Sequence, residues 1–191
     1  MKITPQNSEQ IVSTASDIFG GREKFLEAAK KELDETDDRW NQNVEVIGRI
    51  LRAHLFLEHY LTKYLSQANP RLGSLTESKL SFNQKISLLD SHNQDIAFIL
   101  PGIRRLNAIR NRLAHNLGAQ VTEEDKKVFL ECGRFAAMRS ERSATQAIEE
   151  SPLDVLEDFA KHTHIVFTYE FSPISKAINI AIDKVQEGDI N

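Results

Sequence analysis

Residues 103–116 read IRRLNAIRNRLAHN, and the interpretation of the whole sequence starts from this stretch. Its apolar side chains recur at helical spacing and fall on one stripe of a helix. The members of the stripe are Ile103, Leu106, Leu113 and Leu117. Arg110 lies in the middle of it. Because a guanidinium in an apolar seam is costly unless it is paired, the pattern predicts a partner for Arg110, which a carboxylate or a bound anion could supply.

The composition supports a site for an anion at the same place. The chain has 191 residues, of which 40% are apolar and 27% charged, and its net charge is −4. Mild acidity argues against broad electrostatic binding of nucleic acid. However, no carboxylate occurs between Asp95 and Glu123, where the arginines Arg104, Arg105, Arg110 and Arg112 gather. One local basic patch on an acidic protein indicates an anion site.

The sequence also excludes several classes of protein. Cys132 is its single cysteine, which rules out an internal disulfide and suits a reducing cytoplasm. Residues 1–10 are polar, unlike a signal peptide, and no apolar run is long enough to span a membrane. We expect no metal, because His162 and His164 point to different sides of a helix. We expect no cofactor, because the glycine patterns that bind phosphates or dinucleotides are absent.

Helical periodicity and capping signals predict an all-α bundle. Helices are expected near residues 8–19, 22–38, 40–67, 81–90, 101–116, 123–139, 153–164 and 173–185. The expected organisation is an N-terminal helical extension (1–39), a bundle (40–139) and a C-terminal helical extension (140–191). A typical domain has about 150 residues, so a chain of 191 residues favours one domain with an appendage.

Several boundaries rest on particular residues. Gly20-Gly21 should end the first helix, and Ser78 or Ser81 should open the fourth. Pro101 fits the first turn of its helix. Thr122 with Asp125 resembles a capping box. Residues 140–145 are expected as a linker, and residues 164–171 are β-branched and aromatic, so an extended segment is an alternative there.

Three polar residues at the end of the 103–116 helix are the candidate chemical groups. Asn111 and His115 are four residues apart and share a face, whereas Arg110 and His115 lie about 140° apart around the helix. Arg110 and His115 could converge if the arginine bends, the last turn opens or a second copy faces the first. The plainer interpretation is a stabilised helix end, because cations favour the negative end of the helix dipole.

The long helix at 40–67 has a comparable feature. Its stripe contains His54 and Glu58 among apolar residues. Glu58 is a natural partner for Arg110 if the two helices pack, because guanidinium and carboxylate fit in a bidentate manner. Alternatively, both side chains lie at the edge of the seam and reach water.

These residues resemble a known family. Residues 110–115 (RNRLAH) resemble the R-x4-H signature of HEPN domains, in which a polar residue often follows the arginine. Residues 54–58 (HLFLE) resemble the upstream helix with an acidic residue among apolar ones, and residues 80–89 (LSFNQKISLL) resemble the Phe-x-x-Lys-Ile stretch of bacterial members. The resemblance extends roughly from Val44 to Met138.

The resemblance implies an antiparallel bundle that dimerises. Many HEPN proteins are metal-independent endoribonucleases that act as toxins or in antiviral defence. The implied reaction is attack by the 2′-hydroxyl of RNA, with Arg110 binding the phosphate, His115 transferring protons, Asn111 positioning and Glu58 orienting Arg110. Arg112 and Arg105 are candidate substrate-binding residues.

The sequence therefore supports two hypotheses about function. The first is an endoribonuclease with a composite site in a homodimer, with RNA as substrate and a nucleotidyltransferase antitoxin as a conceivable protein partner. The second is a non-catalytic HEPN-like dimeric module, which binds a nucleotide or a partner protein. In the second hypothesis the acidic C-terminal helices dock the partner.

Overall fold

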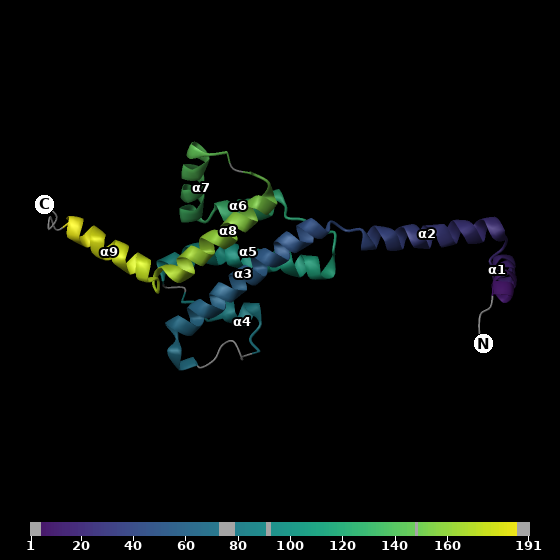
Figure 1. Ribbon diagram of the computed structural model, residues 1–191, viewed down its shortest axis with the longest axis horizontal. Coiled ribbons are helices and arrows are strands. Elements are labelled where there is room, and N and C mark those ends of the chain that lie inside the picture. Colours follow the sequence, from purple (N-terminus) through teal and green to yellow (C-terminus); the bar gives the residue numbers. More distant parts are fainter. Residues whose placement is uncertain (1–4, 73–78, 91–92, 148, 187–191) are drawn as a thin grey trace. The chain divides into compact units, whose positions relative to one another are not determined.

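Helices make up most of the described part of the structure. The computed structural model describes residues 5–72, 79–90, 93–147 and 149–186. All regular elements within these ranges are helices, which confirms the all-α class. The chain divides into two units, residues 1–44 and residues 45–191. Figure 1 shows the first in purple to dark blue and the second in blue through yellow.

The first unit consists of α1 (Pro5–Ile18) and α2 (Arg22–Trp40). They are joined at Gly20 and Gly21, whose φ angles of 96° and 114° are readily adopted only by glycine. The expected break at this pair is therefore confirmed. Phe19 and Phe25 meet edge to face with ring centroids 5.9 Å apart, and α2 contains no buried residue.

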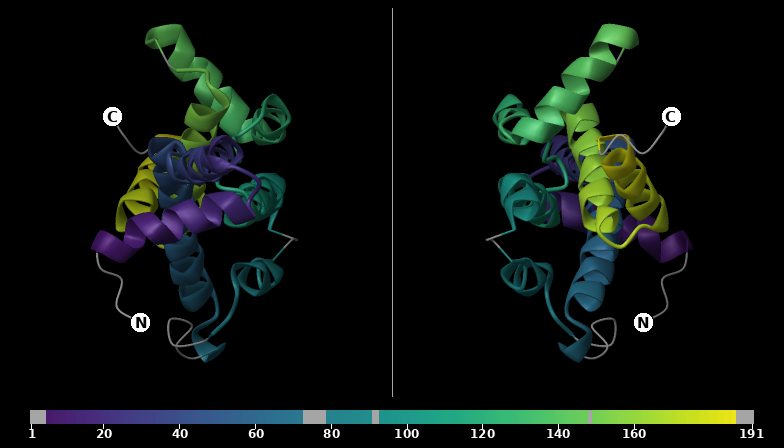
Figure 2. Two further views of the ribbon diagram at one scale, coloured as in Figure 1. Left: turned by 90° about the vertical axis from the view of Figure 1, so that its right-hand side faces the viewer. Right: turned by 90° about the vertical axis from the view of Figure 1, so that its left-hand side faces the viewer.

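The second unit holds the hydrophobic core. Its elements are α3 (Val44–Ala68), the 3-10 helix η1 (Pro70–Leu72), α4 (Phe82–Ser87), α5 (Gln94–His115), α6 (Glu123–Leu130), α7 (Gly133–Thr145), α8 (Pro152–Tyr169) and α9 (Pro173–Gln186). Leu57 and Leu61 of α3, Ile103 and Leu106 of α5 and Phe159 of α8 are fully buried in one cluster. Part of α7 projects away from the other helices of this unit in both views of Figure 2.

Helix α8 belongs to this core, although the sequence analysis assigned it to a C-terminal extension. Phe159 packs between Phe129 of α6 and Phe135 of α7, with centroids 4.9 and 5.5 Å away. Arg49 of α3 also forms ion pairs with Asp154 and Glu157 of α8. The helix runs to Tyr169, so residues 164–169 are not extended.

Two helix boundaries differ from the prediction for local reasons. Helix α5 begins at Gln94, because Asn93 accepts hydrogen bonds from the backbone of the first turn, and Pro101 lies inside the helix. The expected helix over 123–139 is interrupted at residues 131–132, and α7 continues through the expected linker. Buried Arg139 anchors α7, since it bonds to Asp158 and to the Glu149 carbonyl oxygen.

The capping predictions are confirmed where they can be observed. Ser81 opens α4 with a capping box to Gln84, and Thr122 opens α6 with a capping box to Asp125. The alternative start at Ser78 lies outside the described residues. None of the helices in the described ranges has the length and apolar character needed to cross a membrane.

Two glycines give a matched test of the packing. A Cβ atom on Gly102 of α5 would lie 2.2 Å from Cζ of Phe159, whose ring is held by two neighbouring rings, whereas a Cβ on Gly48 of α3 would meet nothing within 4 Å. Gly102→Ala should therefore lower the free energy of unfolding by about 2 kcal/mol through overpacking. Gly48→Ala should raise it by roughly 0.5–1 kcal/mol through helix propensity. Urea denaturation measures both, and equal effects of the two substitutions would contradict this packing.

Candidate functional site

A polar network joins α3, α4 and α5; His54 and Asn107 are buried, whereas Asn83 is exposed. Nε2 of His54 lies 3.3 Å from Oδ1 of Asn107, and Nδ2 of Asn107 donates to Oδ1 of Asn83 at 2.8 Å. The imidazole also packs on Phe82, with ring centroids 4.4 Å apart. Because buried polar groups must find partners, this network fixes how the three helices meet.

Burial beside this network lowers the basicity of His54. Burial lowers its pKa, and the positive charges of Arg110 and Lys85 act in the same direction. The hydrogen bond with Asn107 and the charge of Glu58 oppose this effect without cancelling it. His54 is therefore held in its neutral form, and the side chain of Arg110 is near enough for its charge to act on the imidazole.

Glu58 pairs with a different cation from the one expected. The sequence suggested Arg110 as its partner, but Oε1 of Glu58 accepts a hydrogen bond from Nζ of Lys85 at 2.7 Å. Lys85 lies on α4 and is itself buried, so its ammonium needs a carboxylate. The orienting role proposed for Glu58 is thus corrected: this carboxylate neutralises Lys85.

The candidate residues at the end of α5 are on the surface. Arg110, Asn111 and His115 are all exposed. Nη1 of Arg110 donates to Oδ1 of Asn111 at 3.3 Å. Within the described part of the chain, Arg110 forms no ion pair and His115 forms no hydrogen bond. These cationic and polar groups are therefore accessible to an external anion.

Arg105 and Arg112, expected to bind substrate, are engaged inside the protein. They are seven residues apart on one face of α5, and both reach the carboxylate of Asp125. Nε of Arg105 lies 2.6 Å from Oδ1, and Nη1 of Arg112 donates to the same oxygen at 3.2 Å. Asp125 is 0% exposed and also accepts the backbone N–H of Thr122 at 2.9 Å. The two arginines therefore fasten α6 to α5.

The pKa of Asp125 shows how strong this arrangement is. Burial alone would raise the pKa of the carboxyl group. The hydrogen bonds from Arg112 and Thr122, together with the charges of Arg112 and Arg105, outweigh burial and hold the pKa below its usual range. The carboxylate is therefore ionised at neutral pH and depends on its cations.

An apolar surface adjoins the exposed cation. Tyr64 near the end of α3 and Ile96 near the start of α5 line one cavity, so the two helices run antiparallel and the N-terminal half of α3 lies beside the end of α5. Leu51 and Leu55 are on the same face of α3 as Glu58 and are 38% and 64% exposed. This half of α3 thus leaves apolar side chains at the surface, which another chain could cover.

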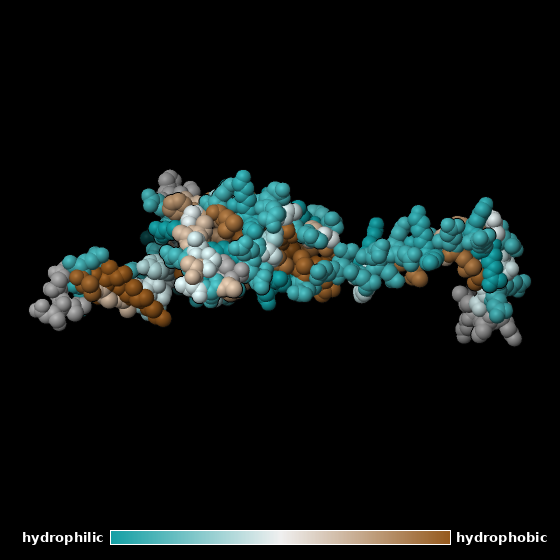
Figure 3. All heavy atoms as spheres, turned by 90° about the horizontal axis from the view of Figure 1, so that it is seen from above, coloured by the Kyte–Doolittle hydropathy of each residue, from teal (hydrophilic) through white to brown (hydrophobic). Residues whose placement is uncertain are grey.

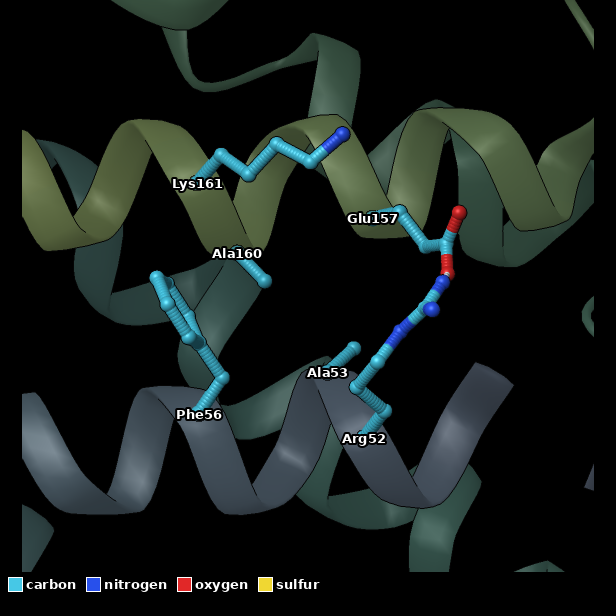
Figure 4. A pocket seen from close by; sticks show the side chains of 6 residues that line it. All are labelled: Arg52, Ala53, Phe56, Glu157, Ala160 and Lys161. Carbon is cyan, nitrogen blue, oxygen red and sulfur yellow. Dashed lines mark hydrogen bonds and ion pairs between the residues drawn. The ribbon is translucent and has the colours of Figure 1, made fainter. Parts of the chain in front are cut away.

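Two cavities were not foreseen from the sequence. The first, of about 340 Å³, lies between α3 and α8. Figure 4 shows Ala53 and Ala160 facing each other across it, with Arg52 reaching towards Glu157 at one side. Only the pairing of two distant alanines could have indicated it, and that pairing depends on the packing of α8.

The second cavity, of about 440 Å³, is lined by tyrosines, charged groups and His162. Burial and the charge of Arg134 lower the pKa of His162. Neither ring nitrogen has a hydrogen-bond partner among the described residues. No group of three or more histidine, cysteine, aspartate or glutamate side chains in the described ranges is placed to hold a metal ion.

Comparison with known proteins found no match to this chain. No family model matches the sequence, no curated protein matches it, and no solved structure matches the fold. The HEPN resemblance therefore stays a prediction that rests on the residues quoted above.

The free energy of unfolding should distinguish the arginines of α5 that pair with Asp125 from the exposed Arg110. Arg112→Ala leaves the buried Asp125 carboxylate with one guanidinium fewer, so it should lower the free energy of unfolding by about 1–3 kcal/mol. Arg110→Ala, which removes an exposed cation without an ion pair among the described residues, should change it by less than about 0.5 kcal/mol. Chemical denaturation of both variants tests this, and a destabilised Arg110→Ala protein would assign Arg110 a structural role.

The lowered pKa of His54 predicts a pH-dependent stability. The unfolded chain binds a proton near pH ~6.5, whereas folded His54 resists protonation, so stability is lost as the pH falls below that value. His54→Gln should therefore show a shallower decline in unfolding free energy between about pH 7 and pH 5. Part of the decline should remain, because burial also lowers the pKa of His162 and His164. His59→Gln, an exposed change on the same helix, is the control, and an unchanged slope in His54→Gln would refute the assignment.

Proposed function

We propose that the exposed end of α5 binds a phosphodiester of RNA and that two copies of the chain form a metal-independent endoribonuclease of the HEPN type. One observation carries the proposal: α5 uses Arg105 and Arg112 to hold Asp125 but leaves Arg110, Asn111 and His115 at the surface. A purely structural helix end would not need this second set of groups. The exposed set matches the residues of the R-x4-H resemblance.

Each exposed side chain has a role in this proposal. The Arg110 guanidinium binds a non-bridging phosphate oxygen and stabilises the charge that collects there. Asn111 holds the guanidinium through the 3.3 Å hydrogen bond from Nη1 of Arg110. His115 transfers protons, which imidazole does efficiently near neutral pH.

The reaction is an internal transfer within RNA. The 2′-oxygen attacks the adjacent phosphorus while the bond from phosphorus to the 5′-oxygen breaks, which leaves a 2′,3′-cyclic phosphate and a 5′-hydroxyl. One His115 accepts the proton of the 2′-hydroxyl. The protonated His115 of a second copy donates a proton to the departing 5′-oxygen, so the charges balance.

The geometry of α5 explains why a second copy is needed. Arg110 and His115 are five residues apart, which separates them by about 140° around the helix. A single helix end therefore cannot easily direct both groups at one phosphate. Leu51 and Leu55 provide an exposed apolar surface beside the site on which a second copy could pack.

The biological setting follows from the resemblance alone. A ribonuclease of this kind would act as a toxin or in antiviral defence, and a nucleotidyltransferase antitoxin is the protein partner that the resemblance suggests. The α8 carboxylates are poor candidates for binding such a partner, because Asp154, Glu157 and Asp158 form ion pairs within the chain.

A non-catalytic interaction module is the second candidate, and α9 favours it. Ile174, Ile178 and Ile182 recur every four residues on α9 and are all exposed. Figure 3 shows this row as a continuous apolar stripe along the helix. An exposed stripe of this kind is typical of a surface that binds another protein.

Ribonuclease assays of the purified full chain decide between the candidates. The wild type should cleave single-stranded RNA in excess EDTA and leave cyclic phosphate ends. Arg110→Ala and His115→Ala should each reduce the rate by at least about a hundredfold, since each removes charge stabilisation or proton transfer from the transition state.

Arg104→Ala is the matched control, because it removes an exposed cation of the same helix that has no role in the proposed reaction. It should retain most of the cleavage rate. A wild-type protein that folds and dimerises but cleaves no RNA would reject the nuclease and favour the interaction module. Equal loss of activity in all three variants would indicate a general charge effect.

A further inference from the structure

Helix α2 carries a seam that the proposed nuclease site does not use. Its members recur at alternating spacings of three and four residues, which is the repeat of a coiled-coil helix. They are Leu26, Ala29, Leu33, Thr36 and Trp40. All are exposed, and the three large ones are 53%, 61% and 83% exposed. We call these five residues the α2 seam.

The neighbouring helix leaves the seam uncovered. The α2 residues that are partly buried are Phe25, which contacts Phe19, and Ala28. They lie on a face adjacent to the seam, and only near the start of α2. Because a helix in a protein gains most of its stability from packing its apolar face against another element, the seam indicates a partner.

We propose that the α2 seam pairs in an antiparallel manner with the same seam of a second copy of this chain. In the antiparallel register, Leu33 lies opposite Thr36 of the second copy and Ala29 lies opposite Trp40. The largest side chain thus packs over the smallest, which is how facing core positions interdigitate. The two-fold symmetry of the pair repeats each contact.

The charges beside the seam select this orientation. In the antiparallel pair, Lys30 faces Asp37 of the second copy and Glu32 faces Arg39, so that four opposite-charge pairs form. A parallel pair would instead place Glu32 against Asp37 twice, which is repulsive. The side chains of these four residues form no ion pair within the described part of the chain. They are therefore available to a partner.

The pairing is independent of the proposed ribonuclease. It involves α2 only, whereas the nuclease proposal depends on α5 and the nearby face of α3. Either can fail without the other.

The single tryptophan makes the pairing measurable in the full chain. Trp40 is exposed in the structure of one chain and is the only tryptophan in the sequence. Dilution from about 100 µM should shift its emission to longer wavelength as the pair dissociates, in the weak range expected for a short seam. Arg104→Ala, an exposed change on α5 outside the proposed nuclease site, should give the same Trp40 shift as wild type over this range.

Charge variants test the orientation. Lys30→Glu should weaken association by about tenfold, because two attractive pairs become repulsive. Asp37→Lys should weaken it similarly, and the double variant Lys30→Glu with Asp37→Lys should restore it. Lys31→Glu is the matched control, since Lys31 faces away from the seam and pairs with Glu35 on its own helix at 4.0 Å.

Three outcomes would overturn the proposal. Trp40 emission that is blue-shifted but independent of concentration would mean that the seam packs on its own chain. A concentration-dependent Trp40 shift that survives Leu33→Asp would place the contact outside the seam. Asp37→Lys that strengthens association would indicate a parallel pair, in which residue 37 faces Glu32. Loss of RNA cleavage with intact α2 association would leave this inference standing and refute only the nuclease.

Discussion

The carboxylate of Asp125 is the constraint on which the arrangement of the candidate site depends. A fully buried carboxylate is costly unless it is paired, and here Arg105, Arg112 and the Thr122 backbone supply its partners. These partners offset the cost of burying the carboxylate, and they fix α6 on the second half of α5. Because Arg105 and Arg112 share one face, Arg110 lies about 140° from the first and about 160° from the second around the helix, and it is left out of the pairing.

A different set of polar contacts fixes the other side of α5. Asn107 bonds to His54 and Asn83, and Glu58 neutralises Lys85, so α3 and α4 meet α5 in one register. The same register lays the N-terminal half of α3 beside the end of α5. These hydrogen bonds therefore bring the exposed Arg110 and the exposed leucines of α3 to the same end of the two helices. None of these exposed side chains takes part in the bonds. Such polar contacts specify an arrangement even where they add little stability.

The sequence was sufficient for features that depend on neighbouring residues. The glycine pair after α1, the Ser81 start of α4 and the capping box of α6 each involve residues within four positions of one another. Their physics is local, so the chain alone reveals it. Pro101 is predicted in the first turn of its helix, but α5 begins seven residues earlier, at Gln94, because Asn93 caps it there.

The features that the sequence did not reveal depend on which helices meet. Asp125 could be recognised as a cap, but its two arginines come from a helix whose orientation is a tertiary matter. Glu58 had two cations within conceivable reach, and the position of α4 selected Lys85. The apolar face of α8 could have belonged to an extension or to the core. Only the fit of Phe159 against Gly102, where no side chain fits, decides for the core.

Symmetry links the two contacts proposed between copies of this chain. Each is isologous, because the same surface is used on both partners, and each therefore has its own two-fold axis. If the α5 contact and the α2 seam share one axis, both form within a single closed dimer and reinforce each other through effective concentration. If the axes differ, the α5 contact makes dimers and the α2 seam joins them into a larger assembly. The exposed stripe of α9 would then be carried in several copies on one particle, which multiplies weak binding to a partner.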